Sequence, residues 1–155
     1  MQRPTEYKDL LSRGFFIHEP ALPGATEALL ESAQNHLNAW QQLSAAGLTT
    51  PALTAAYEGL SQLFRAIFEY REVRPVEGCW TTATLVACRD LGMGVAEQCL
   101  VSVLHDARAP TSCSSSFPSK SLDDAREVGA LLRKYLPAAA QVMHLVLRPT
   151  SPLKV

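Results

Sequence analysis

Residues 50–75, TPALTAAYEGLSQLFRAIFEYREVRP, decide the fold, because their pattern is that of one long amphipathic helix. Apolar residues recur alternately four and three positions apart, which places them in one stripe along a helix. The stripe consists of Leu53, Tyr57, Leu60, Phe64 and Ile67. Further apolar side chains widen it, so we expect this helix to be covered on more than one side and to form the centre of the fold.

The two ends and one internal glycine of this helix carry their own signals. Thr50 is expected to cap the first turn with its hydroxyl, and Pro51 fits the first turn because no partner for its nitrogen is needed there. Pro75 marks the expected stop, since the residue before a proline is biased away from helical geometry. Gly59 would cost about 1 kcal/mol relative to alanine inside a helix, so its presence indicates close packing.

Helical signals continue on both sides of the central stretch. A second apolar stripe between Pro23 and Ala46 predicts a helix that Gly47 ends in a left-handed conformation. The short turn that follows makes these two helices antiparallel neighbours. The remaining helices are expected at residues 4–13, 81–91, 95–107 and 121–147. Pro137 is expected to kink or end the last of them.

The fold class predicted from this pattern is all-α, an antiparallel helical bundle of about five helices. No segment alternates over strand length, and Phe15 to Pro20 is expected to pack as an extended arm. In the helix at 95–107, we expect Val95, Cys99 and Val103 to point inward.

The chain of 155 residues is long enough for one domain with its own core. We expect the bundle at residues 21–148, an N-terminal arm with a short helix at 1–20, and a tail at 149–155. The Ser-rich segment 109–118 is the one low-complexity loop, and its composition cannot form a core.

Composition excludes several function classes. The chain has 14 basic and 15 acidic residues and a formal charge of −1, so no global basic field attracts nucleic acid. No run approaches the roughly 20 apolar residues that span a bilayer, and no signal peptide is expected. These features predict a cytoplasmic protein with no membrane association.

The four cysteines show none of the close pairing that metal sites use. They are Cys79, Cys88, Cys99 and Cys113. We expect the three within apolar helical surroundings to be buried, reduced thiols. No metal site and no cofactor is predicted.

His105 and Arg108 are the first candidate pair for chemistry. Two residues three apart share one face of a helix, so this pair could hold a phosphate and move a proton, as a ribonuclease requires. The alternative is a basic cap on the negative end of the helix.

Arg65, Arg71 and Arg74 are the second candidate set, because they could line a phosphate-binding groove. The alternative is a solvated face with local ion pairs, since acidic residues lie among them. Tyr57, Phe64 and neighbouring aromatics could likewise stack on bases, or belong to the core or to a dimer interface.

Three segments resemble HEPN domains. The segment AAYEGLSQLFRAIFEYREVRP (residues 55–75) is similar to the second helix of that family, with its Ala-Tyr pair and Arg-Pro-bounded turn. ALLESAQNHLNAWQQLSAAG (residues 28–47) resembles the first helix, and SLDDAREVGALLRKYLPAAA (residues 121–140) resembles the closing helix. The resemblance covers roughly residues 24 to 140 in the family's order.

This resemblance implies a helical domain that commonly dimerises. Many members are ribonucleases of toxin–antitoxin, defence or RNA-processing systems, and others are non-catalytic partners of nucleotidyltransferases. The family's catalytic pattern is an Arg followed four to six residues later by a His. Arg108 lies in the corresponding region, but Ser112, Cys113 and Ser114 follow it.

Three functions therefore remain as hypotheses. The first is a non-catalytic, dimeric HEPN-like binding or accessory module whose partner is RNA, a nucleotide-handling enzyme or another protein. The second is a divergent metal-independent ribonuclease in which Arg108 holds the phosphate and His105 is the acid or base. The third is a helical interaction protein, such as a chaperone-like subunit.

Overall fold

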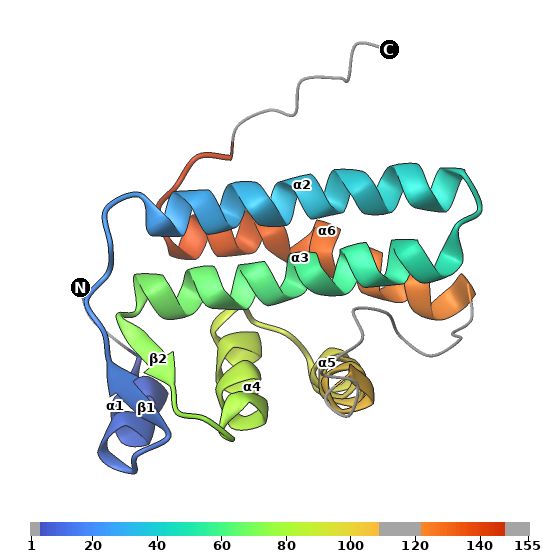
Figure 1. Ribbon diagram of the computed structural model, residues 1–155. Coiled ribbons are helices and arrows are strands. Elements are labelled where there is room, and N and C mark those ends of the chain that lie inside the picture. The colour runs from blue at the N-terminus through green and yellow to red at the C-terminus, as the bar shows by residue number, and fades with distance from the viewer. Residues whose placement is uncertain (1–3, 109–121, 148–155) are drawn as a thin grey trace.

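The central helix, α3 (Thr49–Tyr70), lies between two layers of the molecule in the computed structural model (Figure 1). The structure describes residues 4–108 and 122–147. Its other elements are α1 (Thr5–Ser12), β1 (Phe16–His18), α2 (Ala25–Ala45), β2 (Val73–Pro75), α4 (Trp80–Asp90), α5 (Val95–Arg108) and α6 (Leu122–Val142). The prediction of an all-α class with a helical bundle is confirmed.

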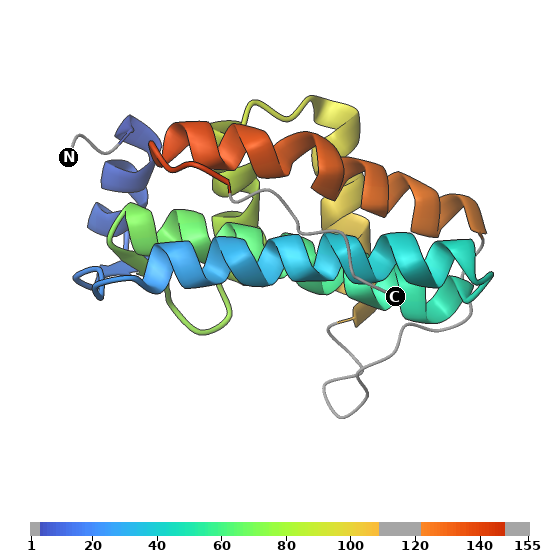
Figure 2. The same cartoon turned by 90° about the horizontal axis from the view of Figure 1, so that it is seen from above.

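One layer is a bundle of long helices. α2 runs antiparallel to α3, and α6 runs beside both of them, in the direction of α3 (Figures 1 and 2). On the other side of α3, α4 and α5 run across it rather than along it (Figure 1). This crossing is why α3 is apolar on more than one side. Eleven of its 22 residues are buried.

Both ends of α3 differ from the sequence-based prediction. The helix begins at Thr49, Leu48 is the residue before it, and no side chain caps the first turn. The capping role predicted for Thr50 is therefore wrong, because that residue already lies inside the helix. At the other end the helix stops at Tyr70 rather than near Pro75, since Glu72 takes a left-handed conformation with φ of 55°.

The residues after this turn form a small sheet that the sequence pattern did not predict. β2 pairs with β1 in antiparallel register, with Ile17 opposite Arg74. Three-residue strands are too short to show the alternation by which strands are recognised. Phe16 of β1 is buried against Phe68 of α3 and Tyr7 of α1, with ring centroids 5.6 and 5.7 Å apart. The N-terminal elements thus share the core of the bundle.

The predicted close packing at Gly59 is confirmed. A β-carbon built on Gly59 would lie 2.4 Å from a methyl group of Leu132 on α6. Gly129 of α6 is tighter still, because a β-carbon there would lie 1.7 Å from the indole of Trp40 on α2. The two glycines allow α6 to approach α3 and α2 closely.

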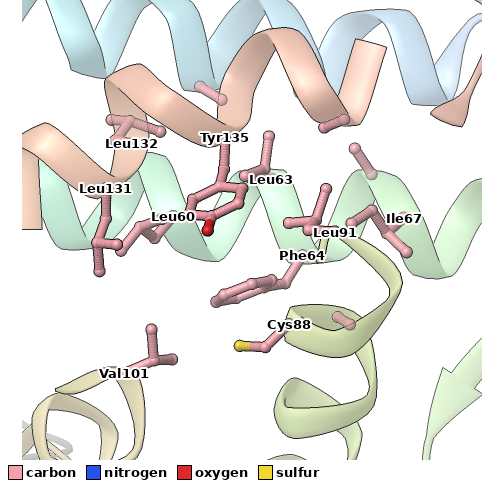
Figure 3. Close-up of a cluster of buried hydrophobic side chains, with 14 of the residues drawn as sticks. Leu60, Leu63, Phe64, Ile67, Cys88, Leu91, Val101, Leu131, Leu132 and Tyr135 are labelled. Atoms are coloured by element: carbon pink, nitrogen blue, oxygen red, sulfur yellow. The ribbon is translucent and has the colours of Figure 1, made fainter. Parts of the chain in front are cut away.

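The predicted inward face of α5 is wrong. Val95 and Val103 are 78% and 60% exposed, and Cys99 is exposed as well. The buried side chains of this helix are Val101 and Leu104. Figure 3 shows Val101 directed at the cluster that Phe64 and Leu60 form below α3. The apolar residues of α5 lie on both of its sides, so periodicity alone could not distinguish the buried side.

Pro137 lies inside α6, and the helix continues to Val142. No helix within residues 4–108 and 122–147 combines the length and apolar character that crossing a bilayer requires.

Candidate functional site

His105 of α5 lies beside Tyr57 of α3. Its Nδ1 atom and the Tyr57 hydroxyl share a hydrogen bond of 3.2 Å, in which the imidazole tautomer decides the donor. Both side chains are half-buried. A fixed Nδ1 atom sets the orientation of the ring, which is a requirement for a histidine that binds a ligand or transfers a proton.

The two residues line a pocket of about 190 Å³ between α3, α4 and α5. Two rows of α3 face it, each made of residues four positions apart. The apolar row holds Leu60 and Phe64, and the polar row holds Tyr57, Ser61 and Arg65. Residues four apart lie one above the other on a helix, so the sequence of α3 gives the pocket one apolar and one polar side.

The opposite walls come from α4 and α5. Trp80, which is 41% exposed, and the buried Thr84 lie on α4, and Leu104 lies beside His105 on α5. Trp80 meets Phe68 edge-on at 6.1 Å between ring centroids, which fixes its place at the pocket mouth. Figure 3 shows Phe64 reaching from α3 between Cys88 of α4 and Val101 of α5.

The structure separates the three arginines that the sequence grouped. Arg65 is exposed and lines the pocket with His105. Arg74, on the exposed edge of β2, lies 3.5 Å from Glu19. Arg71 lies at the end of α3 and is directed at Asp90 of α4. Of the three, Arg65 is the one that shares a described pocket with the candidate histidine.

Arg71 is paired with a carboxylate inside the protein and does not line the pocket. Its guanidinium donates two hydrogen bonds to Asp90, of 3.0 and 2.8 Å, and both side chains are about one-tenth exposed. Tyr7 donates a third hydrogen bond to the same carboxylate at 2.9 Å. Burial and the neighbouring Asp90 raise the pKa of Tyr7 well above its ordinary value. This cluster ties α1 and α4 to the end of α3, and its carboxylate already neutralises the cation.

Arg108 is the last residue of α5. Its side chain and the Ser-rich segment 109–118 lie outside the described residues, so the pairing of His105 with Arg108 stays a prediction.

The cysteines differ in exposure. Cys88 is buried in the core, as predicted, and burial raises the pKa of its thiol to about 12. Cys79 is half-buried and Cys99 is exposed, contrary to the prediction for Cys99. Within the described residues, no group of three or more His, Cys, Asp or Glu side chains is arranged to hold a metal ion.

Several pocket residues were missed from sequence. Ser61 carries no motif, although its place between Tyr57 and Arg65 at helical spacing was visible. Trp80 and Thr84 belong to a different helix, and only the tertiary crossing of α4 beneath α3 brings them to the pocket.

One Arg-to-His spacing of five also occurs in the chain, at Arg13 and His18, outside the region of HEPN resemblance. Arg13 follows α1, where it lies 3.4 Å from Asp9 and stacks over the ring of Phe15. His18 is exposed on β1. Neither residue lines the pocket beside His105.

No protein-family model matches this chain, and no curated protein is significantly similar to it in sequence. The chemistry of the pocket and the order of the helices are therefore the features of the molecule that bear on its function.

Proposed function

We propose that the chain is a HEPN-like helical binding module that does not itself cleave RNA and that serves an RNA- or nucleotide-handling system. The observation that carries the proposal is the pocket between α3, α4 and α5. There a half-exposed tryptophan, an oriented histidine and an arginine surround one small cavity. Aromatic side chains beside basic ones are the combination that binds single-stranded nucleic acid.

The arrangement of the long helices supports the comparison with HEPN domains. The segments that resemble the first and second helices of that family are α2 and α3, which form the antiparallel pair expected from the short turn between them, and α6 packs along them (Figure 2). The resemblance of the closing segment is consistent with α6, which begins with Asp123 and Asp124 in its first turn.

A second copy of the chain remains part of the proposal, but α3 does not offer the surface for it. Most apolar side chains of α3 are buried within one chain, and Tyr57 and Tyr70 are half-buried. The outer side of α5 suits a dimer better, because Val95 and Val103 lie four residues on either side of Cys99 and all three are exposed. An antiparallel copy of α5 would therefore place each valine against the other one in its partner.

The dimer is tested by sedimentation velocity over a range of concentrations. We expect Val103→Glu to shift the protein to monomer, whereas Val146→Glu, at a valine 94% exposed elsewhere, should leave association unchanged. A monomer at all concentrations in the unaltered chain would contradict the dimer.

The ribonuclease remains the second candidate, since His105 is half-buried at a pocket rather than enclosed in the core. Purified protein is incubated with single-stranded RNA without added metal, and binding is measured in parallel by fluorescence anisotropy. The proposal predicts RNA binding without cleavage. It also predicts that Arg65→Gln weakens this binding, while Arg126→Gln, at an exposed arginine of α6, does not.

Cleavage that His105→Ala and Arg108→Ala both abolish would replace the binding module by the ribonuclease. Cleavage abolished by His18→Ala instead would move the site to Arg13 and His18. Absence of both binding and cleavage would leave the helical interaction protein as the remaining hypothesis.

A further inference from the structure

The pocket between α3, α4 and α5 has a shape and a charge that define its ligand more narrowly than the proposed function does. We propose that it binds a single aromatic ring carrying an anionic group, with the ring among Phe64, Trp80 and Leu104 and the anion at Arg65. The inference extends the proposed function to a ligand class. Either a nucleotide unit or a free aromatic acid or phosphate could supply that chemistry.

The size of the cavity indicates one ring. Its volume is about 190 Å³, and an apolar protein cavity of roughly 150 Å³ holds benzene. Pockets for drug-sized ligands begin near about 300 Å³. One aromatic ring fits the available volume and a larger ring system does not, so the rest of the ligand lies at the open edge, where Arg65 is exposed.

The apolar walls indicate an aromatic ring rather than a polar ligand. Phe64 is 6% exposed and Leu104 is 3% exposed, so both present carbon to the cavity from opposite helices. Trp80 is 41% exposed at the mouth, where a ring could cover its face and remove apolar surface from water. Covering a partly exposed tryptophan gives such a ligand a hydrophobic contribution that is not already made within the chain.

The polar side of the cavity indicates the anion. Among the described residues Arg65 makes no ion pair, and its hydrogen bond to Gln62 is long, at 3.5 Å. None of the described lining residues is acidic. A guanidinium offers several N–H groups to a carboxylate or phosphate at once, so the side chain is available for an anionic group at the pocket edge.

The remaining polar groups lie along the same row of α3. Ser61 is placed between Arg65 and Tyr57, and the Tyr57 hydroxyl is held near His105 at 3.2 Å. Hydroxyl and imidazole groups both donate and accept hydrogen bonds. They can therefore meet the polar edge of a substituted ring, while the anion lies at the Arg65 end.

Trp80 provides the measurement. Its fluorescence is followed while phenyl phosphate, benzoate, uridine 5′-monophosphate or a short oligouridylate is added, with phenol and uridine as uncharged counterparts. Trp80→Phe identifies the signal, because the other tryptophan, Trp40, is buried and bonded to the carbonyl of Ala125. We expect saturable quenching by the anionic ligands and weaker binding of the uncharged ones.

Two variants separate ring and anion. Arg65→Gln should lower the affinity for the anionic ligands by at least about tenfold and leave the affinity for phenol and uridine unchanged. Arg126→Gln should change the affinity for neither kind of ligand. Ser61→Phe fills the cavity from its rim and should abolish binding of both kinds. Far-UV circular dichroism and the thermal midpoint show whether the Ser61→Phe variant is folded. If it is not folded, Thr84→Leu is used instead, because it fills the cavity from α4.

The outcomes distinguish this inference from the proposed function. Absence of saturable quenching by every small aromatic anion at millimolar concentrations would overturn the inference. The inference would also be overturned if Arg65→Gln and Arg126→Gln lost the same affinity for the anionic ligands, or if both cavity-filling variants still bound them. Binding of oligouridylate that survives cavity filling would overturn the inference and leave the proposed function standing. Binding of phenyl phosphate or benzoate without any uridine compound would support the ligand class and contradict the proposed function.

Discussion

Trp40 and Gly129 illustrate how one residue fixes the packing of two helices. The indole of Trp40 lies over the backbone of α6 at Gly129 and donates a hydrogen bond of 2.9 Å to the carbonyl of Ala125, one turn earlier. The absent side chain of Gly129 and the indole nitrogen therefore act together. Because both groups come from different helices, their contact defines the register of α2 against α6.

This contact predicts that Gly129→Ala destabilises the protein, although alanine is the better helix former by about 1 kcal/mol. The added carbon would lie 1.7 Å from the Trp40 ring, so the indole must move and strain its hydrogen bond. We expect a loss of roughly 1–3 kcal/mol in the free energy of unfolding, measured by urea denaturation. Gly94→Ala is the comparison, because the nearest neighbour of its added carbon would be 3.7 Å away. Since Gly94 directly precedes α5, we expect it to lose only the preference for glycine over alanine at a helix N-cap, roughly 0.5–1 kcal/mol.

At the scale of residues, features set by local backbone geometry could be predicted from the sequence, whereas contacts with residues of other elements could not. Gly59 could be predicted to pack closely because a helix interior penalises glycine. The partners of Arg71 could not, since Asp90 and Tyr7 come from other helices. The three arginines at positions 65, 71 and 74 are close in sequence, and this closeness suggested one shared site. Their environments differ because a different element packs beside each of them.

At the scale of elements, Glu97 joins α5 to α6. It is the third residue of α5, and its carboxylate accepts a hydrogen bond of 3.0 Å from the backbone nitrogen of Gly94, just before the helix. This is the reach-back bond of a capping box. The same side chain accepts hydrogen bonds from Tyr135 at 2.5 Å and Lys134 at 3.2 Å.

We expect Glu97→Ala to lower the free energy of unfolding by about 2 kcal/mol, because the cap is lost and the partly buried hydroxyl of Tyr135 loses its acceptor. Hydrogen exchange should accelerate in α5 more than in α2. Lys134→Ala is the control, since the lysine is 64% exposed and its ion pair should contribute less than about 1 kcal/mol. An equal loss in both variants would show that the cap and the tyrosine contribute little.

The same contact predicts a dependence on pH. The hydrogen bond from Tyr135 is the main reason that the pKa of Glu97 is lowered in the folded protein. A lowered folded pKa adds stability that is complete above the ordinary glutamate value of about 4.3 and is lost as the pH falls through the folded value. Urea denaturation between pH 6 and the acidic range should therefore show a smaller loss for Tyr135→Phe than for the unaltered chain. If the free energy of unfolding fell equally with pH in both proteins, the predicted role of the Tyr135 hydrogen bond would be contradicted.

Element positions could largely be predicted, whereas the orientation of α5 could not. The helices α1, α2, α4 and α6 follow from their apolar spacing, and a glycine placed shortly after the end marks the stop of α1, α2 and α4. α5 has Val95, Cys99 and Val103 on one side and Val101 and Leu104 on another. The contacts that accompany the observed orientation come from elsewhere in the sequence, such as the hydrogen bond between Glu97 and Tyr135 across 38 positions, and they cannot be read from the spacing within α5.

At the scale of the whole molecule, α3 makes the two layers one structure. Its buried residues belong to a single hydrophobic cluster that reaches from Trp40 and Leu132 in the bundle to Cys88 and Val101 beneath it. Figure 3 shows side chains of α3 directed both to α6 and to α4. The candidate pocket lies at the edge of this cluster, so its walls are held by the same packing that holds the fold.

This continuity predicts one cooperative unfolding transition. Trp40 reports on the bundle, and Trp80 reports on the layer of α4 and the pocket. Labelling both with 5-fluorotryptophan gives two fluorine resonances in an otherwise unaltered chain, and Trp80→Phe assigns them. Because α3 contributes apolar side chains to both layers, loss of either layer exposes core surface of the other. We therefore expect both resonances to convert at the same urea concentration. Conversion of Trp80 at a clearly lower concentration would mean that the pocket layer unfolds independently and that the cluster is not one core.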